Sequence, residues 1–367
     1  MKFAINPQKL VSGMQRVIGV VERRLTLPIL ANVLCSIDGQ KMRFTATDLE
    51  VEIEHICELD ESFEPTEFTI PGHKFYDICK SLSVDTVYFC YENQKVSLKT
   101  ESAHYTLASL PAADFPNIEQ VQPLIEFNLS QRQLKQLLNQ TQFAMADQDV
   151  RFYLNGMLLQ VAGDTIHAVA MDGHRFAHAE LILADTSNLG EQQVLVPFKG
   201  IIELNRLLEN NNDPITIKFC SNYLWVEMEN LWFRSKLIDG VFPDYNLIMR
   251  NIGQQTINVE KKSFKQALSR LAILASSQLN AVRVEINAHS MKLLAINQES
   301  DEAWEKLSIQ YQGEPTVLGF NIKYLLDMLA VIEADTVSIQ FSSLDKGVLF
   351  SGSDEERTSY IIMPLRL

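Results

Sequence analysis

Phe3-Ala4-Ile5-Asn6-Pro7-Gln8-Lys9-Leu10 decides the fold of this chain, because its pattern occurs three times. The pattern is that of a short strand, a capping turn and the start of an amphipathic helix. It returns at Phe127-Asn128-Leu129, before Ser130, and at Ile257-Asn258-Val259, before Lys261. The three starts lie 124 and 130 residues apart. Self-similarity at a fixed spacing predicts three copies of one structural unit.

A second unit of the same kind occurs inside each copy. Its strands are Phe68-Thr69-Ile70-Pro71, Val194-Leu195-Val196-Pro197 and Thr316-Val317-Leu318-Gly319, each followed by a helical pattern. We therefore expect six helices, in 7–20, 73–82, 130–143, 198–209, 261–276 and 321–332. The intervening sequence alternates apolar and polar residues, as half-buried strands do. The predicted class is α+β, with helices on one side of antiparallel sheets.

Extended connectors that contain proline separate the copies. Leu110-Pro111-Ala112-Ala113-Asp114-Phe115-Pro116 precedes the second copy, and Ile238-Asp239-Gly240-Val241-Phe242-Pro243-Asp244-Tyr245 precedes the third. Proline favours extended or turn backbone and ends regular elements. We therefore predict three domains, at 1–122, 123–252 and 253–367.

Length, apolar runs and cysteines indicate a cytoplasmic protein. The chain has 367 residues, of which 46% are hydrophobic. It contains no apolar run of about 18 residues that could span a bilayer, and its first residues lack the apolar core of a signal peptide. Five scattered cysteines form no CxxC pair, which favours reduced core thiols over a disulfide framework or a zinc site.

The charge is sorted by structural element. The net charge is −14. The six helix windows nevertheless hold 13 lysines and arginines against four acidic residues, a balance of +9 that leaves −23 elsewhere. Lysines that merely solvate helix surfaces would be mixed with acids, whereas three windows contain no acid. A basic stripe on an acidic body suits a polyanion that is held on one face.

A search for reactive motifs finds one cluster. The chain contains no GxGxxG, GxxxxGK[ST], HExxH or GxSxG pattern. Asp172, His174 and His178 are close in sequence and allow a metal-assisted hydrolase as an alternative. The competing interpretations are a tight Asp-Gly turn and the rim of a binding pocket. A scaffold that never contacts DNA is a further alternative, which the sorted charge disfavours.

The order of several motifs resembles one family along the whole chain. The motifs are Leu25-Thr26-Leu27-Pro28-Ile29-Leu30, Thr45-Ala46-Thr47-Asp48-Leu49-Glu50, Leu110-Pro111-Ala112-Ala113-Asp114-Phe115-Pro116, Gln148-Asp149-Val150-Arg151-Phe152-Tyr153-Leu154-Asn155-Gly156-Met157 and Asp172-Gly173-His174-Arg175. The chain thereby resembles the bacterial DNA polymerase III beta subunit, the replicative sliding clamp, of gammaproteobacterial type. The resemblance implies a non-enzymatic processivity factor and a head-to-tail homodimeric ring of six domains. Helices line its inner face around duplex DNA, and sheets form its outer wall.

The resemblance also implies contacts with DNA that do not read sequence. Arg24 and Gln148 stand at matching positions, Lys199 lies in the matching loop, and Tyr153 lies near both DNA and the peptide pocket. Phe198 stands where close relatives carry arginine. The implied DNA-binding residues are Arg24, Lys74, Gln148, Tyr153, Lys199, Lys261, Lys262 and Lys265.

A peptide-docking pocket is the family's second implied site, for motifs of the Gln-Leu-x-Leu-Phe kind. Methionine-rich apolar surface suits a promiscuous site, because methionine repacks around different anchors. Met171 and Leu247 replace the threonine and arginine of relatives and make the pocket more apolar. The implied residues are Leu154, Met171, Gly173, His174, Arg175, Phe176, Pro243, Leu247, Ile248, Ile361, Met363, Pro364, Leu365 and Arg366.

The protomer interface would join the first domain to the third domain of a partner. The matching positions are Lys74, Ile78, Tyr105 and Leu107 on one side, and Ile273, Leu274, Glu299, Asp301, Glu302 and Glu305 on the other. Implied partners are a clamp-loader ATPase, the replicative polymerase catalytic subunit, translesion polymerases, and mismatch-repair and ligase-type proteins. We expect no cofactor, metal or membrane partner, and association with the nucleoid during replication.

Overall fold

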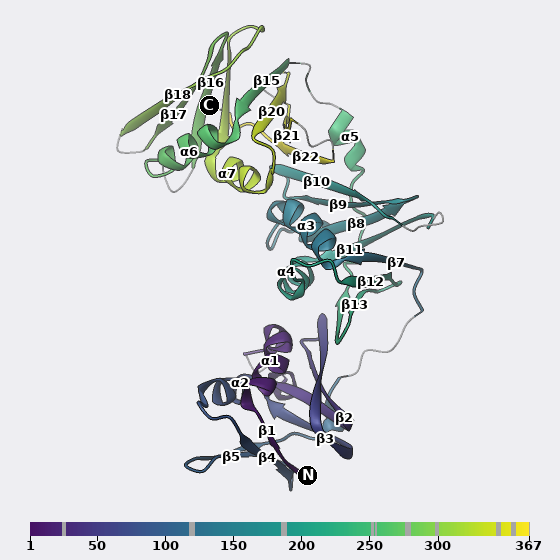
Figure 1. Ribbon diagram of the computed structural model, residues 1–367. Coiled ribbons are helices and arrows are strands. Elements are labelled where there is room, and N and C mark those ends of the chain that lie inside the picture. The colour runs from purple at the N-terminus through teal and green to yellow at the C-terminus, as the bar shows by residue number, and fades with distance from the viewer. Residues whose placement is uncertain are drawn as a thin grey trace. The chain divides into compact units, whose positions relative to one another are not determined.

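The computed structural model describes residues 1–23, 27–116, 122–184, 189–250, 253, 255–275, 280–297, 301–342, 346–353 and 357–366 (Figure 1). The chain divides into two compact units. Unit 1 comprises 1–132 and 202–237, and unit 2 comprises 133–201 and 238–367. The central repeat thus contributes to both units. Among the described residues, no helix is both long and apolar enough to cross a membrane.

Unit 1 contains two antiparallel sheets. The four-stranded sheet has the order β1-β4-β5-β6 and the bounds Lys2–Ile5, Val87–Glu92, Lys95–Lys99 and His104–Ala108. The six-stranded sheet has the order β2-β3-β14-β13-β12-β7 and the bounds Asn32–Thr47, Val51–Pro71, Leu231–Lys236, Tyr223–Met228, Pro214–Phe219 and Ile125–Ser130. Pairing of β3 with β14 joins the first repeat to the central one, because Leu231 lies opposite His55.

Unit 2 contains an eight-stranded and a four-stranded antiparallel sheet. The eight strands run β11-β8-β9-β10-β22-β21-β20-β15, at Glu191–Pro197, Gly156–Ala162, Thr165–Met171, Arg175–Ile182, Thr358–Ile362, Val348–Gly352, Thr336–Phe341 and Gln255–Glu260. The four run β18-β17-β16-β19, at Glu302–Ser308, Ser290–Ile296, Ala281–Asn287 and Thr316–Asn321. Pairing of β10 with β22 joins the central repeat to the third, since Arg175 lies opposite Ile362.

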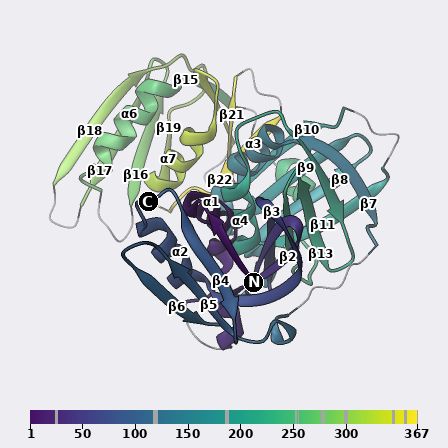
Figure 2. The same ribbon diagram turned by 60° about the horizontal axis from the view of Figure 1, so that its bottom comes forward.

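Six helices of ten or eleven residues coincide with the predicted windows. They are α1 (Pro7–Val17), α2 (Gly72–Ser81), α3 (Gln131–Thr141), α4 (Phe198–Leu207), α6 (Lys261–Leu271) and α7 (Ile322–Val331). Local capping explains two of the starts. The Asn6 side chain accepts a hydrogen bond from the Gln8 N–H before α1, and Asn321 accepts one from Lys323 before α7. In both views α6 and α7 lie side by side (Figures 1 and 2).

The apolar faces that the sequence predicts are the buried faces. Leu10, Met14 and Val17 of α1 have no exposed surface. In α6, Phe264 and Leu268 are equally buried. Helix α1 approaches its sheet so closely that a Cβ atom at Gly13 would lie 2.6 Å from the Phe44 ring. The α+β class and the three repeats are therefore confirmed.

One element differs from the expectation. The sequence around Pro243 predicts an extended connector, whereas the chain forms a short helix, α5 (Tyr245–Arg250), directly after it. The Asp244 side chain accepts a hydrogen bond of 3.0 Å from the Asn246 N–H and so begins this helix. Six residues are too few to show a helical period, which is why the pattern analysis missed α5. Of the five free cysteines, Cys35, Cys79 and Cys220 are buried, whereas Cys57 and Cys90 are half-buried.

Candidate functional site

A tight turn at Asp172 organises the end of strands β9 and β10. The Asp172 Oδ1 atom accepts hydrogen bonds of 2.9 Å from the N–H groups of both His174 and Arg175. Gly173 between them has a φ of +88°, a conformation that suits glycine. A Cβ atom there would also lie 2.8 Å from the Arg151 guanidinium. The structure therefore confirms the predicted Asp-Gly turn.

The Arg175 side chain is held by carboxylates on both sides. Its Nε donates to Asp172 Oδ2 at 2.9 Å, and its Nη1 donates to Asp327 Oδ2 at 2.7 Å. The guanidinium also lies over the Tyr324 ring, 4.5 Å from the ring centre. Only 12% of the side chain is exposed. Arg175 therefore joins β10 to α7, and its charge is already neutralised within the chain.

A buried apolar cluster lies beside this turn on the eight-stranded sheet. It contains four of the residues implied for peptide docking, and a fifth, Ile248, packs against it. The four are Leu154, Met171, Phe176 and Ile361. We call this cluster, together with the exposed side chains of Leu247, Met363 and Leu365, the apolar site.

Backbone hydrogen bonds fix the part of the apolar site that comes from residues 363–365. The Met363 N–H donates to the His174 carbonyl at 2.8 Å, and the Leu365 N–H donates to the Gly319 carbonyl at 2.8 Å. Met363 and Leu365 remain 42% and 36% exposed. Pro364 is half-buried and Arg366 is exposed. Apolar side chains on a fixed backbone offer a ready surface for an apolar partner.

Helix α5 and the connector before it form another part of the apolar site. Phe242 and Tyr245 belong to the buried cluster, and Met249 packs against it. Pro243 is half-buried, whereas Leu247 is 57% exposed. Phe242, Tyr245 and Met249 are not among the residues implied for peptide docking. The sequence does have an apolar residue on each side of Pro243-Asp244. The prediction of an extended connector gave no reason to place these two residues in a pocket.

The loop from Gln148 to Asn155 is held by Asp149. The Asp149 carboxylate accepts three hydrogen bonds from Arg151, one from its N–H and two from its guanidinium, at 2.8 to 3.0 Å. These bonds lower the pKa of the carboxyl to about 2. Gln148 is exposed with a φ of +58°, and Tyr153 is half-buried against the apolar site.

The basic residues implied for DNA contact lie on several elements. Lys74 on α2, Lys199 on α4, and Lys262 and Lys265 on α6 are exposed. The Lys261 Nζ instead donates to the Ile332 carbonyl at 2.8 Å, just beyond α7. Arg24 lies outside the described residues.

Some of the helix charge is neutralised by ion pairs within the chain. Four helix cations pair with acids: Lys9 with Asp60, Arg16 with Glu209, Arg206 with Glu203, and Arg270 with Glu305. Three of these acids, Asp60, Glu209 and Glu305, lie outside the helices. The helices are therefore less positive than the sequence count suggests.

The residues implied for the protomer interface lie on edge strands and their neighbours. Tyr105 and Leu107 lie on β6, an edge strand of unit 1, and Lys74 and Ile78 lie on α2. Glu302 and Glu305 lie on β18, an edge strand of unit 2, and Asp301 precedes it. Ile273 is 82% exposed in the turn after α6, beside the half-buried Leu274. Glu299 lies outside the described residues.

The groups of the hydrolase alternative do not converge. Asp172 is occupied by the turn and by Arg175. His174 and His178 are four residues apart around the start of an extended strand, which corresponds to roughly 13 Å of backbone. His178 instead contacts His167, with 3.1 Å between Nε2 and Nδ1. The predicted trio is thus wrong as a catalytic site.

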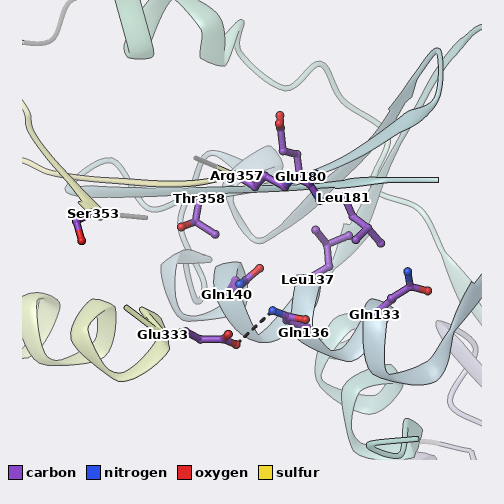
Figure 3. Close-up of a pocket in the computed structure, with 10 residues that line it drawn as sticks. All are labelled: Gln133, Gln136, Leu137, Gln140, Glu180, Leu181, Glu333, Ser353, Arg357 and Thr358. Carbon is purple, nitrogen blue, oxygen red and sulfur yellow. Dashed lines mark hydrogen bonds between the residues drawn. The ribbon is translucent and has the colours of Figure 1, made fainter. Parts of the chain in front are cut away.

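A separate cavity of about 660 Å³ lies on the helix side of unit 2. Figure 3 shows its lining, to which α3 contributes Gln133, Gln136 and Gln140 and the third repeat contributes Glu333, Ser353, Arg357 and Thr358. Gln136 Nε2 donates to Glu333 Oε1 at 3.2 Å. The amide and charged groups make this lining polar, unlike the apolar site. The sequence analysis did not predict this cavity.

Comparison with known proteins identifies the class. Three family models match in order: the N-terminal domain of the DNA polymerase III beta subunit at residues 1–119, its central domain at 128–244 and its C-terminal domain at 248–366. The chain belongs to the DNA polymerase III beta-subunit family. It is therefore a DNA sliding clamp, a non-catalytic subunit.

Individual relatives agree over the full length. The beta sliding clamp of Pseudomonas putida is 40% identical and that of Vibrio cholerae 38%, each with 100% of both chains covered. The crystal structure of the DNA polymerase III subunit beta from Pseudomonas aeruginosa has a TM-score of 0.95 and 40% identity, again with both chains fully covered. The expectation of a clamp of this family is confirmed.

Proposed function

We propose that two copies of this clamp close head to tail into a ring around duplex DNA. We further propose that short peptides from replication and repair proteins dock on the apolar site. We also propose that the three domains of the chain span residues 1–122, 123–252 and 253–367.

The first turns of the helices carry the DNA part of the proposal. None of the six helices of ten or eleven residues has an acidic residue in its first turn. Each has a lysine or arginine among its first three residues, namely Lys9, Lys74, Arg132, Lys199, Lys261 and Lys323. A cation at a helix N-terminus opposes the helix dipole and costs about 0.3–1 kcal/mol. A DNA phosphate near the helix N-terminus turns this free-energy cost into a favourable contribution, because both the dipole and the cation attract the phosphate.

The two edge strands support the closure of a ring. β6 and β18 end their sheets, so each has backbone groups without a partner strand in its own sheet. Both alternate exposed and half-buried residues, and Tyr105 and Leu107 are the half-buried positions of β6. Asp301 and Glu302 place negative charge beside β18, and Lys74 places positive charge in the unit that contains β6. Complementary charge sets the register of such an interface more than its strength.

The exposed side chains of the apolar site support peptide docking. Leu247 and Met363 are large, apolar and exposed, and each lies two residues from a member of the buried cluster, Tyr245 and Ile361 respectively. A sliding clamp from Pseudomonas aeruginosa has been solved bound to griselimycin. The clamp of C. crescentus has been solved with PEG bound to its putative beta-motif tethering region. Its chain is 30% identical to this one, with a TM-score of 0.94.

The partners follow from what a ring needs. A closed ring must be opened before it can enclose circular DNA, and the sequence contains no phosphate-binding loop of the GxxxxGK[ST] kind. A separate clamp-loader ATPase would supply that work. The docked partners would be the replicative polymerase catalytic subunit, translesion polymerases, and mismatch-repair and ligase-type proteins, in the cytoplasm and on the nucleoid.

Retention on DNA tests the ring. The protein is loaded on nicked circular DNA with a clamp loader and ATP, and its retention is followed before and after the circle is cut. Retention on circles with release through free ends is the expected result. Equal retention on both forms would mean ordinary DNA affinity and would refute the ring.

A charge reversal tests the role of the helices. Two double variants are compared. The first changes Lys262 and Lys265 on α6 to Glu, and the second changes Lys41 and Lys95, which are also exposed but lie on strands, to Glu. The helix variant is expected to be loaded onto DNA less efficiently. The slope of the logarithm of its DNA-binding constant against the logarithm of salt concentration is expected to be shallower by about 0.9 for each lost phosphate contact. Equal effects of the two variants would refute a DNA-facing role for α6.

Fluorescence anisotropy with a labelled peptide that contains Gln-Leu-x-Leu-Phe tests docking. Met363→Asp is expected to weaken binding by at least about tenfold, since it places a charge among apolar contacts. Tyr88→Asp, at a 60% exposed site on β4, is the control and leaves binding unchanged. Unchanged binding by the Met363 variant would remove the apolar site from the proposal.

A further inference from the structure

Two histidines and a glutamate lie together on the face of the eight-stranded sheet that also carries Tyr245. His167 on β9 is directly opposite Glu180 on β10. His178 is two residues before Glu180 on the same strand, so its side chain is on the same face. Neither the proposed ring nor the apolar site as defined above uses these three groups.

The spacing of their polar atoms is that of ligands around one metal ion. His167 Nδ1 lies 3.1 Å from His178 Nε2 and 3.4 Å from Glu180 Oε2. All three ligand atoms lie within 4.8 Å of one another. With metal–ligand bonds of about 2.0–2.1 Å, a tetrahedral site places neighbouring ligand atoms about 3.3 Å apart. An ion could thus bind all three with only small side-chain movements.

The protonation of the histidines fits this role. Burial, together with a smaller effect of the neighbouring His167, lowers the pKa of His178 to about 4. Burial also lowers the pKa of His167, although Glu180 opposes this change. A neutral imidazole offers a lone pair to a metal ion. In the structure the two facing nitrogens share one hydrogen bond, which a metal ion would replace.

Neighbouring side chains hold the imidazoles in place. The rings of His167 and His178 stack with their centres 5.4 Å apart, and the Tyr245 ring lies 5.7 Å from that of His178. The Tyr245 hydroxyl donates to Gln160 Oε1 at 2.8 Å. Gln160 lies directly opposite His167 on β8. Packing of this kind restricts the orientation of a ligand before the metal arrives.

We propose that His167, His178 and Glu180 form a binding site for a divalent transition-metal ion, with Zn²⁺ as the best fit. Two imidazole nitrogens and one carboxylate favour Zn²⁺ over Mg²⁺ or Ca²⁺, which prefer sets of oxygen ligands. His178 is buried, whereas the His167 and Glu180 side chains are 18% and 33% exposed. The ion can therefore enter from solvent, and a water molecule can complete its coordination.

The ion would link β9 to β10 behind α5. Because it binds the folded arrangement and not the unfolded chain, it raises the stability of unit 2. Its three ligands belong neither to the proposed protomer interface nor to the apolar site, so metal binding can be tested without either activity.

The test uses the full chain after treatment with a chelator. Isothermal titration with ZnCl₂ is expected to show one strong site per chain, and Zn²⁺ is expected to raise the melting temperature. Titration with Co²⁺ is expected to give the visible absorption bands of a tetrahedral complex. Absence of saturable Zn²⁺ binding by the unaltered chain would overturn the proposal.

Matched variants separate this site from other metal-binding groups, such as the five cysteines. His167→Gln and Glu180→Gln change partly exposed side chains, and each is expected to weaken binding by at least about tenfold. His289→Gln changes an exposed histidine outside the site and is expected to leave binding unchanged. Unfolding in urea without metal checks that each variant is folded. Unchanged Zn²⁺ affinity in both His167→Gln and Glu180→Gln would overturn the assignment.

Discussion

Arg175 on β10 and Asp327 on α7 are joined by a hydrogen bond of 2.7 Å, although 152 residues separate them in the chain. Asp172 holds the same guanidinium from the other side, and the Tyr324 ring lies beneath it. Replacing Arg175 would leave two largely buried carboxylates without their shared cation.

Arg175→Ala is therefore expected to destabilise unit 2 by about 2–4 kcal/mol, because removing one partner of a buried ion pair leaves the other charge uncompensated. Arg175→Lys is expected to recover only part of this, since lysine cannot donate in two directions from a planar group. Urea unfolding measures both.

The control for this prediction is Arg283→Ala. Arg283 pairs with Glu285 at 3.0 Å but is 47% exposed, so its loss is expected to cost less than about 1 kcal/mol. Equal losses for the two alanine variants would contradict a structural role for the Arg175 bridge.

Gly173→Ala is expected to damage the turn next to the apolar site. The substitution forces an L side chain into a φ of +88° and against the Arg151 guanidinium, which costs about 1–2 kcal/mol for the backbone alone. Peptide affinity is expected to fall with stability. Gly163→Ala, which has a φ of +66° but open space around it, is expected to cost less and to leave peptide affinity unchanged. Anisotropy and urea unfolding distinguish the two outcomes.

Ile273→Asp is expected to convert the proposed homodimer into monomers without destabilising the monomer, because 82% of the side chain is already exposed. Val241→Asp, with 83% exposure, is the matched control and is expected to remain dimeric. Sedimentation velocity over a range of concentrations measures the change. A dimer of unaltered strength in the Ile273 variant would place the interface elsewhere.

His55 is expected to make unit 1 less stable in acid. Burial, together with a smaller effect of the nearby Arg16 charge, lowers the pKa of His55 to about 4. A histidine of the unfolded chain titrates near 6.5. The unfolded state thus binds more protons between these values, so stability falls as the pH decreases from about 6.5 to about 4.

The size of this effect is on the order of 2 kcal/mol, after allowance for the partial exposure of the ring. Urea unfolding at a series of pH values measures it in the unaltered chain and in His55→Gln. The difference between the two curves of stability against pH reports on His55 alone, because both proteins contain the same carboxylates. Parallel curves over the whole range would show that His55 does not titrate as expected.

The helices could be predicted from the sequence because their signals are local. The capping residue Asn6, the proline at position 7 and the spacing of Leu10 and Met14 lie within a few residues of one another. Helix α5 has no such signal in its six residues. The predicted motif around Asp172 was recognised as a turn for the same local reason.

The pairing of strands could not be predicted in the same way, and this pairing determines which residues form the histidine cluster. The spacing of His174 and His178 would suit one face of a helix. The chain is extended there, and the register of β9 with β10 brings His167 and Glu180 together instead. The Arg175–Asp327 bond likewise depends on how the central and third repeats meet. Seven residues of the apolar site came from resemblance to a family, because they are spread over more than 200 positions of the chain: Leu154, Met171, Phe176, Leu247, Ile361, Met363 and Leu365.

Shared sheets join the repeats on both sides of the central one. Five residue pairs connect β10 to β22, and five connect β14 to β3. Bending at either junction would break backbone hydrogen bonds cooperatively, whereas separating two protomers would break only one interface. In the proposed ring, each of these two junctions would therefore move as one rigid part, and a hinge would have to lie elsewhere.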